Sequence, residues 1–96
     1  MRIQDAVDVT GDGAAHTLSS LLGVTRAKWF QVDALSIAST AIRIGGSSIS
    51  ATRGIPVGPG GAQFAPPVAE LSNFYHLDEI YYLIQVGDTA AFSCGL

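Results

Sequence analysis

The chain is poor in charged residues. Only 14% of its 96 residues are charged, whereas a solvated globular protein carries about 25%. By contrast, 48% of the residues are hydrophobic. So few charges indicate that part of the surface is covered by another protein surface, and self-association is the simplest way to cover it. A compact, weakly charged monomer is the alternative.

Cysteine and histidine are scarce as well. The single cysteine, Cys94, has no partner for a disulfide within this chain. Its apolar neighbours indicate a small buried side chain, and we expect synthesis in a cytoplasm. His16 and His76 lie far apart and do not form the closely spaced Cys/His pairs that bind zinc. We therefore expect both histidines on the surface or in an interface, not in a catalytic group with Cys94.

Clustered positive charge and long apolar runs are also lacking. The net charge is −3 and the pI is about 5, which argues against a nucleic-acid-binding face. No apolar run approaches the ~20 residues of a membrane span. The N-terminal stretch "MRIQDAVDV" has acidic residues where a signal peptide would be apolar. We expect neither a nucleic acid nor a membrane as a partner.

Three aspartates are the remaining candidates for a metal site. Asp8, Asp12 and Asp88 could converge on a cation near predicted turns, because hard cations favour carboxylate oxygens on loops. However, "DVTGDG" lacks the acidic spacing and the terminal glutamate of a calcium loop. Turn formation is the favoured interpretation. We expect no cofactor, no metal and no enzymatic activity.

The segment "SNFYHLDEIYY" is rich in aromatic residues. Phe74, Tyr75, Tyr81 and Tyr82 could form a platform on which a sugar stacks. Such residues more often belong to a core or to a protein interface, where their area dominates the binding energy. The core or interface interpretation is favoured.

Short alternating segments predict β-strands along most of the chain. "AKWFQVDALSIA" places Phe30, Val32 and Ala34 on one face, a period-two pattern typical of a strand. "AIRIGG" is predicted to place Ile42 and Ile44 inward. "SSISATRGIPV" is predicted as another short extended piece. Its apolar positions are Ile49 and Ile55, and Pro56 keeps it away from the centre of a sheet.

The remaining segments predict a turn, a hairpin and one ambiguous element. "HTLSSLLG" fits a helical turn ended by Gly23, or an edge strand with a bend. The flanks of Gly87–Asp88 alternate strongly, so Ile80–Val86 and Thr89–Cys94 are predicted to form a β-hairpin. Pro59–Gly60 belongs to a further predicted turn.

Together these segments predict one all-β domain over residues 1–96. Six to eight short strands indicate a small antiparallel β-sandwich or jelly-roll-like barrel. Residues 1–24 are expected to form an N-terminal arm or edge segment. The predicted core consists of the apolar positions of the clearest strands: Phe30, Val32, Ile42, Ile44, Ile80, Tyr82, Ile84 and Phe92.

Three segments carry a resemblance to a known family: "AKWFQVDA", "AIRIGGSSISATRGIPVGPGGAQF" and "YHLDEIYYLIQVGDTAAFSC". The short motifs within them are Ile44–Gly46, Ser50–Gly54, Pro59–Gly60, Leu77–Tyr81 and Gly87–Asp88. Over roughly residues 25–96 the chain resembles small β-sandwich virion proteins that decorate or cement the heads of tailed bacteriophages. "LDEIYY" departs from the usual "DL-x-x-IY" order, so no role is transferred to Asp78.

The resemblance implies a structural, non-enzymatic virion protein. Such a protein is made in the host cytoplasm, forms a homo-oligomer, often a trimer, and binds the major capsid protein on the head surface at capsomer junctions. The candidate contact residues are arginines and aromatic residues, the types enriched at binding hot spots: Arg26, Trp29, Arg43, Arg53, Tyr75 and Tyr81. A tail, collar or baseplate component, or a carbohydrate-binding module on the virion surface, is the alternative.

Overall fold

Strands make up most of the regular structure of the protein. The structure is a computed structural model and describes residues 3–36, 42–58, 61–70 and 72–96. The elements in these ranges are β1 (Ile3–Thr10), β2 (Ala15–Thr17), α1 (Leu18–Leu22), β3 (Arg26–Ala27), β4 (Trp29–Ser36), β5 (Ile42–Gly45), β6 (Ile55–Val57), β7 (Gln63–Phe64), β8 (Tyr75–His76), β9 (Tyr81–Leu83) and β10 (Thr89–Gly95).

The chain is folded as one long hairpin whose two arms pair along their length. β1 pairs with β10, β2 with β9, β3 with β8, β4 with β7 and β5 with β6, and all pairs are antiparallel. The loop between β5 and β6 is the tip of this long hairpin.

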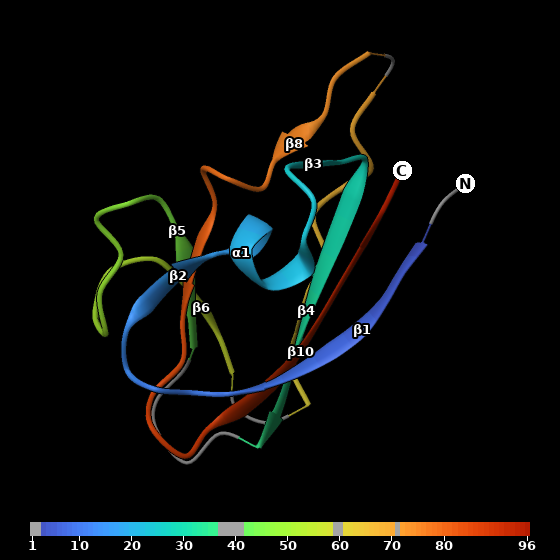
Figure 1. The fold of residues 1–96 in the computed structure, drawn as a ribbon. Helices are drawn as coiled ribbons and strands as arrows, with labels where there is room; N and C mark the ends of the chain where they lie inside the picture. The colour runs from blue at the N-terminus through green and yellow to red at the C-terminus, as the bar shows by residue number, and fades with distance from the viewer. Residues whose placement is uncertain (1–2, 37–41, 59–60, 71) are drawn as a thin grey trace.

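The long hairpin is rolled up by two further pairings, β10 with β4 and β5 with β9. The result is a sheet β1-β10-β4-β7, a sheet β2-β9-β5-β6 and the two-stranded ribbon β3-β8 (Figure 1). Eight strands wrapped in this way into two sheets form a jelly roll. The predicted small antiparallel all-β fold is therefore confirmed.

The predicted hairpin between Ile80–Val86 and Thr89–Cys94 is wrong. β9 and β10 belong to different sheets, so the Gly87–Asp88 turn carries the chain across the sandwich. The sequence correctly predicted a turn at Gly87–Asp88. However, the same residue types form turns within a sheet and turns between sheets, so the turn does not show which strands pair. β9 pairs with β2 and β5, and β10 pairs with β1 and β4, so neither strand pairs with the other.

Two connections cross from one sheet to the other side by side: the one from β1 to β2 and the one from β9 to β10. The Gly11 N–H donates to the Asp88 carbonyl at 2.8 Å, and the Gly13 N–H donates to the Ile84 carbonyl at 2.9 Å. A Cβ on Gly11 would overlap the carbonyl oxygens of Ile84 and Gln85. Glycine is therefore required there by the close approach of the two backbones.

The core lies between the two sheets. The rings of Tyr82 and Phe92 meet across the sandwich with centroids 4.8 Å apart. Ile80 is half-buried against the same cluster, and the other predicted core residues are at most 6% exposed: Phe30, Val32, Ile42, Ile44, Tyr82, Ile84 and Phe92. Cys94 is buried at 2%, so its predicted burial is also confirmed.

Ile55, an apolar position of a predicted extended piece, lies on β6. Its side chain is 49% exposed, whereas that of Val57 is 3% exposed. Ile55 pairs with the inward-facing Ile44, but β6 is an edge strand and no strand of the described chain covers it. Pro56 lies on this edge, as predicted, where its missing N–H costs no central ladder bond. The predicted turn at Pro59–Gly60 lies outside the described residues.

The ambiguous "HTLSSLLG" segment forms the helix α1. Thr17 is the N-cap and accepts a hydrogen bond from Ser20 N–H, and Gly23 ends the helix with φ of 77°. Leu18 and Leu22 are buried, so α1 is stabilised by packing as well as by its caps. No helix in the described ranges combines the length and the apolar character that crossing a bilayer requires.

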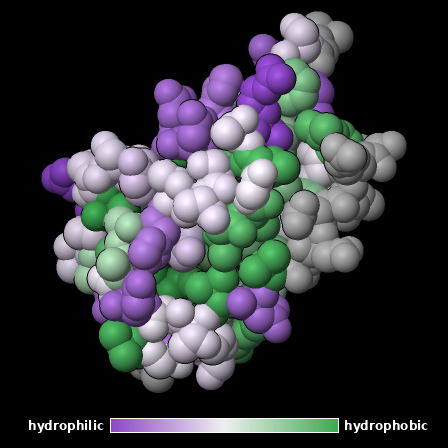
Figure 2. Space-filling model, in the orientation of Figure 1, coloured by the Kyte–Doolittle hydropathy of each residue, from purple (hydrophilic) through white to green (hydrophobic). Residues whose placement is uncertain are grey.

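The N-terminal segment supplies an edge strand to each sheet, β1 to one and β2 to the other, and α1 lies between them. Half-buried apolar residues line this side of the sandwich: Val7, Val9 and Leu21. Green apolar surface gathers in the middle of the face seen in Figure 2, over the region of α1 and β1. This side of the sandwich therefore presents apolar surface to the solvent.

Candidate partner-binding surfaces

Two cations share one aromatic ring beside the β3–β8 ribbon. The Arg26 guanidinium carbon lies 4.9 Å from the centroid of the Phe74 ring, and Lys28 Nζ lies 4.4 Å from it. Both distances are within the range of cation–π attraction. Lys28 Nζ also donates to the Asn73 carbonyl at 2.7 Å, which ties the residue between β3 and β4 to the segment before β8. Arg26 and Lys28 thus place two positive charges around one ring on a chain of net charge −3.

A pocket of about 430 Å³ opens beside this ring. Its lining includes one cation, polar groups and apolar side chains: Gly23, Val24, Thr25, Arg26, Phe74 and Leu96. Val24 is 36% exposed and Leu96 is 44% exposed. Because arginine presents several N–H donors in a planar fork, this surface is suited to a partner segment that carries a carboxylate next to an apolar residue. We call Arg26, Lys28, Phe74 and this pocket the ribbon surface.

A second hollow opens between the sheets beside the edge strands β6 and β7. This cleft of about 340 Å³ is lined by Phe30, Ile44, Gly45, Gly46, Ile55, Phe64, Pro66, Tyr75, Glu79 and Ile80. The Phe30 ring lies between two others, with centroids 5.9 Å from Phe64 and 5.2 Å from Tyr75. The Tyr75 hydroxyl donates to the Pro67 carbonyl at 2.6 Å, so this ring is fixed. We call this hollow the edge cleft.

The loop between β5 and β6 leaves the wall of the edge cleft at Gly46 and returns to it at Ile55. Arg43 braces this loop: its Nε donates to the Ala51 carbonyl at 3.3 Å and an Nη donates to the Gly54 carbonyl at 3.1 Å. Ser50 and Arg53 also form a backbone bridge within the loop. The loop is therefore internally bonded, and the exposed Arg53 lies on it.

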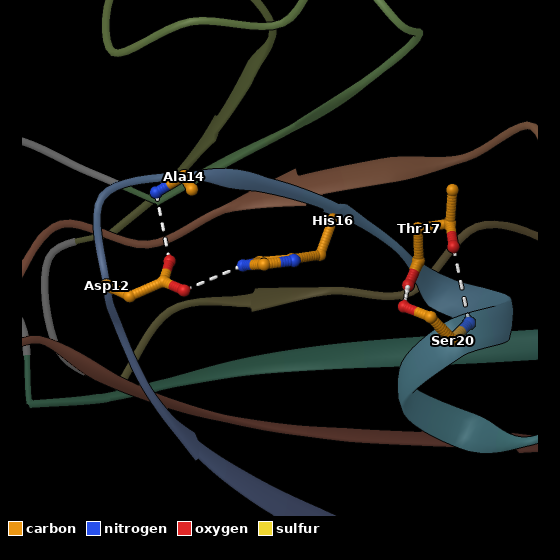
Figure 3. A network of polar contacts seen from close by, with 5 residues as sticks. All are labelled: Asp12, Ala14, His16, Thr17 and Ser20. Atoms are coloured by element: carbon orange, nitrogen blue, oxygen red, sulfur yellow. Dashed lines mark hydrogen bonds and ion pairs between the residues drawn. The ribbon is translucent and has the colours of Figure 1, made fainter.

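A polar group lies at the surface between β1 and α1 (Figure 3). Asp12 accepts a hydrogen bond from the Ala14 N–H at 2.9 Å, and His16 Nε2 lies 2.8 Å from its carboxylate. The Ala14 N–H, followed by His16, holds the pKa of Asp12 below its usual value of 3.8. Burial, with a smaller effect of the Asp12 charge, raises the pKa of Tyr82, whose ring lies 5.6 Å from that of His16.

The six predicted contact residues lie on four different parts of the molecule. Arg26 and Tyr75 lie on the paired strands β3 and β8, where Tyr75 is opposite Ala27. Arg43 and Tyr81 lie on β5 and β9 of one sheet, and Trp29 lies on β4 of the other. Arg53 lies on the β5–β6 loop. The structure thus brings Arg26 and Tyr75 to one ribbon and does not gather all six.

The aromatic residues do not form the common platform that was considered for a sugar. Tyr82 is only 6% exposed, and Tyr75 packs edge-on against Phe30. Phe74 is engaged by Arg26 and Lys28. The role of Lys28 was missed by sequence reasoning because its contact with Phe74 depends on a ribbon of two-residue strands, which carries almost no sequence signal.

The three aspartates considered for a cation occupy different environments. Asp12 and Asp8 are exposed, whereas Asp88 is 1% exposed. Across the described ranges, no three His, Cys, Asp or Glu side chains gather as a metal site would need. His16 is half-buried and His76 is exposed, so the expectation that neither belongs to the core is confirmed.

Comparisons with known proteins return no match for this chain among family models, curated proteins or solved structures.

Proposed function

We propose that this protein is a structural component of a tailed-bacteriophage virion that decorates or cements the assembled head. Copies self-associate, as a trimer in the form that the resemblance implies, and bind the major capsid protein at capsomer junctions on the head surface. Three segments that resemble such proteins support the proposal. The jelly roll also supports it by analogy, because viral capsid proteins use this fold.

The ribbon surface is the observation that carries the proposal. An arginine and an aromatic ring beside an open pocket are the residue types that dominate binding energy at protein interfaces. The ribbon is fixed to the sandwich by the hydrogen bond from the Lys28 N–H to the Gly95 carbonyl at 2.8 Å. The ribbon surface is therefore preformed, and little conformational entropy is lost when a partner binds to it.

Attachment stabilises the shell through repetition. Each contact is modest, but a copy that touches several capsid subunits makes every further contact effectively intramolecular. A ligand that binds only the assembled shell opposes its disassembly by mass action. The function requires no reaction, only a rigid scaffold with surfaces that recognise the lattice.

Co-sedimentation with assembled shells of a tailed phage whose genome carries this chain tests the proposal. We expect the wild-type protein to pellet with the shells. Phe74→Ala and Arg26→Gln should each weaken attachment by about tenfold, the size of a typical hot-spot loss. Leu35→Ala, which removes an exposed apolar side chain on β4, is the matched control and should attach normally. Absence of wild-type attachment, or unchanged attachment of both variants, contradicts the proposal.

A carbohydrate-binding module, or a tail, collar or baseplate component, is the second candidate. The jelly roll favours the first of these, because lectin domains also use this fold. A glycan array separates sugar binding from shell binding. The copy number per particle separates head from tail, since a head protein is present in hundreds of copies and a tail protein in few.

A further inference from the structure

The edge cleft is an apolar opening that reaches the core of the sandwich. Phe30 and Ile44 line it although they are only 4% and 2% exposed, so the cleft extends down to core side chains. Its rim carries Ile55, which is 49% exposed. The same surface therefore carries an exposed apolar side chain, Ile55, and an apolar hollow in which such a side chain fits.

The negative charge of Glu79 indicates which kind of partner segment the edge cleft binds. Among the described residues that line the cleft, Glu79 is the only charged one. It is exposed and lies two residues before β9. A carboxylate at the mouth of an apolar cleft favours an occupant that brings a cation together with apolar atoms. Arginine fits best, because its planar fork binds a carboxylate with two hydrogen bonds and stacks on aromatic rings.

The chain carries this combination on the loop that borders the cleft. Arg53 is two residues before Ile55 and is exposed, and its guanidinium makes no hydrogen bond or ion pair within the described part of the chain. The bonds from Arg43 to the Ala51 and Gly54 carbonyls already fix the loop. A loop ordered in advance loses little conformational entropy when it binds.

We propose that the edge cleft binds a second copy of this chain, whose Ile55 enters the cleft and whose Arg53 pairs with Glu79. A surface that holds both the projecting side chain and the hollow, and both charges, is complementary to itself. The inference rests on the self-association in the proposed function and names a two-fold contact between copies, which joins chains in pairs and is additional to any contact that builds the trimer.

Reversal of the two charges tests this contact in the full chain. Arg53→Glu and Glu79→Arg each place like charges together, so each should weaken self-association by about tenfold or more in sedimentation equilibrium. The double variant Arg53→Glu/Glu79→Arg restores opposite charges and should associate within about threefold of the wild type. Glu70→Arg makes the same charge change as Glu79→Arg at an exposed position outside both the edge cleft and the ribbon surface and should associate normally.

Several results would overturn the proposal. These are a wild-type protein that stays monomeric up to about 1 mM, single variants that associate like the wild type, or a double variant that associates no better than the single ones. Circular dichroism and thermal melts check that every variant is folded. As a measurement that needs no variant, dilution of the wild-type protein should shift the amide resonances of Gly45, Gly46 and Ile80 more than those of the ribbon surface.

This test is separate from the test of shell attachment. If the charge reversal behaves as expected but no copy binds shells, the proposed function fails and the self-association contact stands. If Arg26→Gln weakens attachment while Arg53→Glu and Glu79→Arg leave the oligomer unchanged, the contact fails and the proposed function stands.

Discussion

Several residues that attract attention in the sequence have local structural roles. Arg43 was predicted as a contact residue, and its guanidinium braces the β5–β6 loop through two carbonyl oxygens. Tyr75 was predicted likewise, and it packs on Phe30 while its hydroxyl binds the Pro67 carbonyl. A substitution at either position would therefore disturb a neighbouring surface as well as any direct contact. Arg26 and Arg53 are better probes of binding.

Gly11 should be among the least replaceable residues of the chain. Gly11→Ala would place a Cβ against the carbonyl oxygens of Ile84 and Gln85, and backbone atoms cannot move aside as a flexible side chain can. We expect urea denaturation to show a loss of about 1–3 kcal/mol, the usual cost of overpacking, or more. Gly46→Ala meets no atom within 4 Å and is the control. Equal stability of the two variants would contradict this explanation.

Asp12 should titrate below an ordinary aspartate. Its folded pKa is lowered, so its contribution to stability is present above the unfolded pKa and is lost as the pH falls through the folded pKa, below 3.8. An NMR titration of the Asp12 carboxyl carbon measures this directly. In His16→Gln the midpoint should stay below 3.8, because the Ala14 N–H is the larger cause. A midpoint at or above 3.8 in the wild type would refute the assignment.

At the scale of elements, α1 shows how little sequence is needed to start and stop a helix. Five residues form it, fewer than an isolated helix needs in water. The N-cap, the left-handed Gly23 and the burial of Leu18 and Leu22 together compensate for this short length. The sequence allowed either a helical turn or an edge strand there, since the choice depends on packing between β1 and β2.

Removal of the N-cap should destabilise the protein measurably. In Thr17→Ala the Ser20 N–H loses its acceptor, which is 3.2 Å away in the wild type. We expect a loss of about 1 kcal/mol in the free energy of unfolding. Thr17→Ser keeps a hydroxyl cap and should differ from the wild type by only a few tenths of a kcal/mol. If the two variants are equally stable, the cap has no role.

Strand faces could be predicted from the sequence, whereas strand partners could not. The alternation in β4 and β5 correctly placed Phe30, Val32, Ile42 and Ile44 inside, because side chains alternate along any half-buried strand. The pairing of β9 with β10 was wrong because the partners of both strands, β2 and β5 for β9 and β1 and β4 for β10, are distant from them in the sequence. The candidate surfaces could not be predicted for the same reason. Lys28 contacts Phe74 only because β3 and β8 pair.

At the scale of the whole molecule, the nested pairing makes folding a non-local event. β1 and β10 come from opposite ends of the chain and form neighbouring strands, so the sheet cannot form until the ends meet. Domains dominated by such pairings fold slowly, in milliseconds to seconds. β10 lies between β1 and β4, and its exposure requires the loss of one of these partners.

Cys94 on β10 should therefore report the opening of the whole molecule. Its thiol is 2% exposed, and burial raises its pKa, so the reactive thiolate is both rare and covered. We expect a disulfide reagent at neutral pH to label native Cys94 slowly, at a rate that rises with urea in parallel with global unfolding. A Val86→Cys/Cys94→Ala variant places the thiol at a position that is 78% exposed in the wild type. This thiol should be labelled rapidly without urea. Rapid labelling of native Cys94 without urea would mean that β10 separates from a neighbour while the rest of the jelly roll stays folded, and that the two sheets do not unfold as one unit.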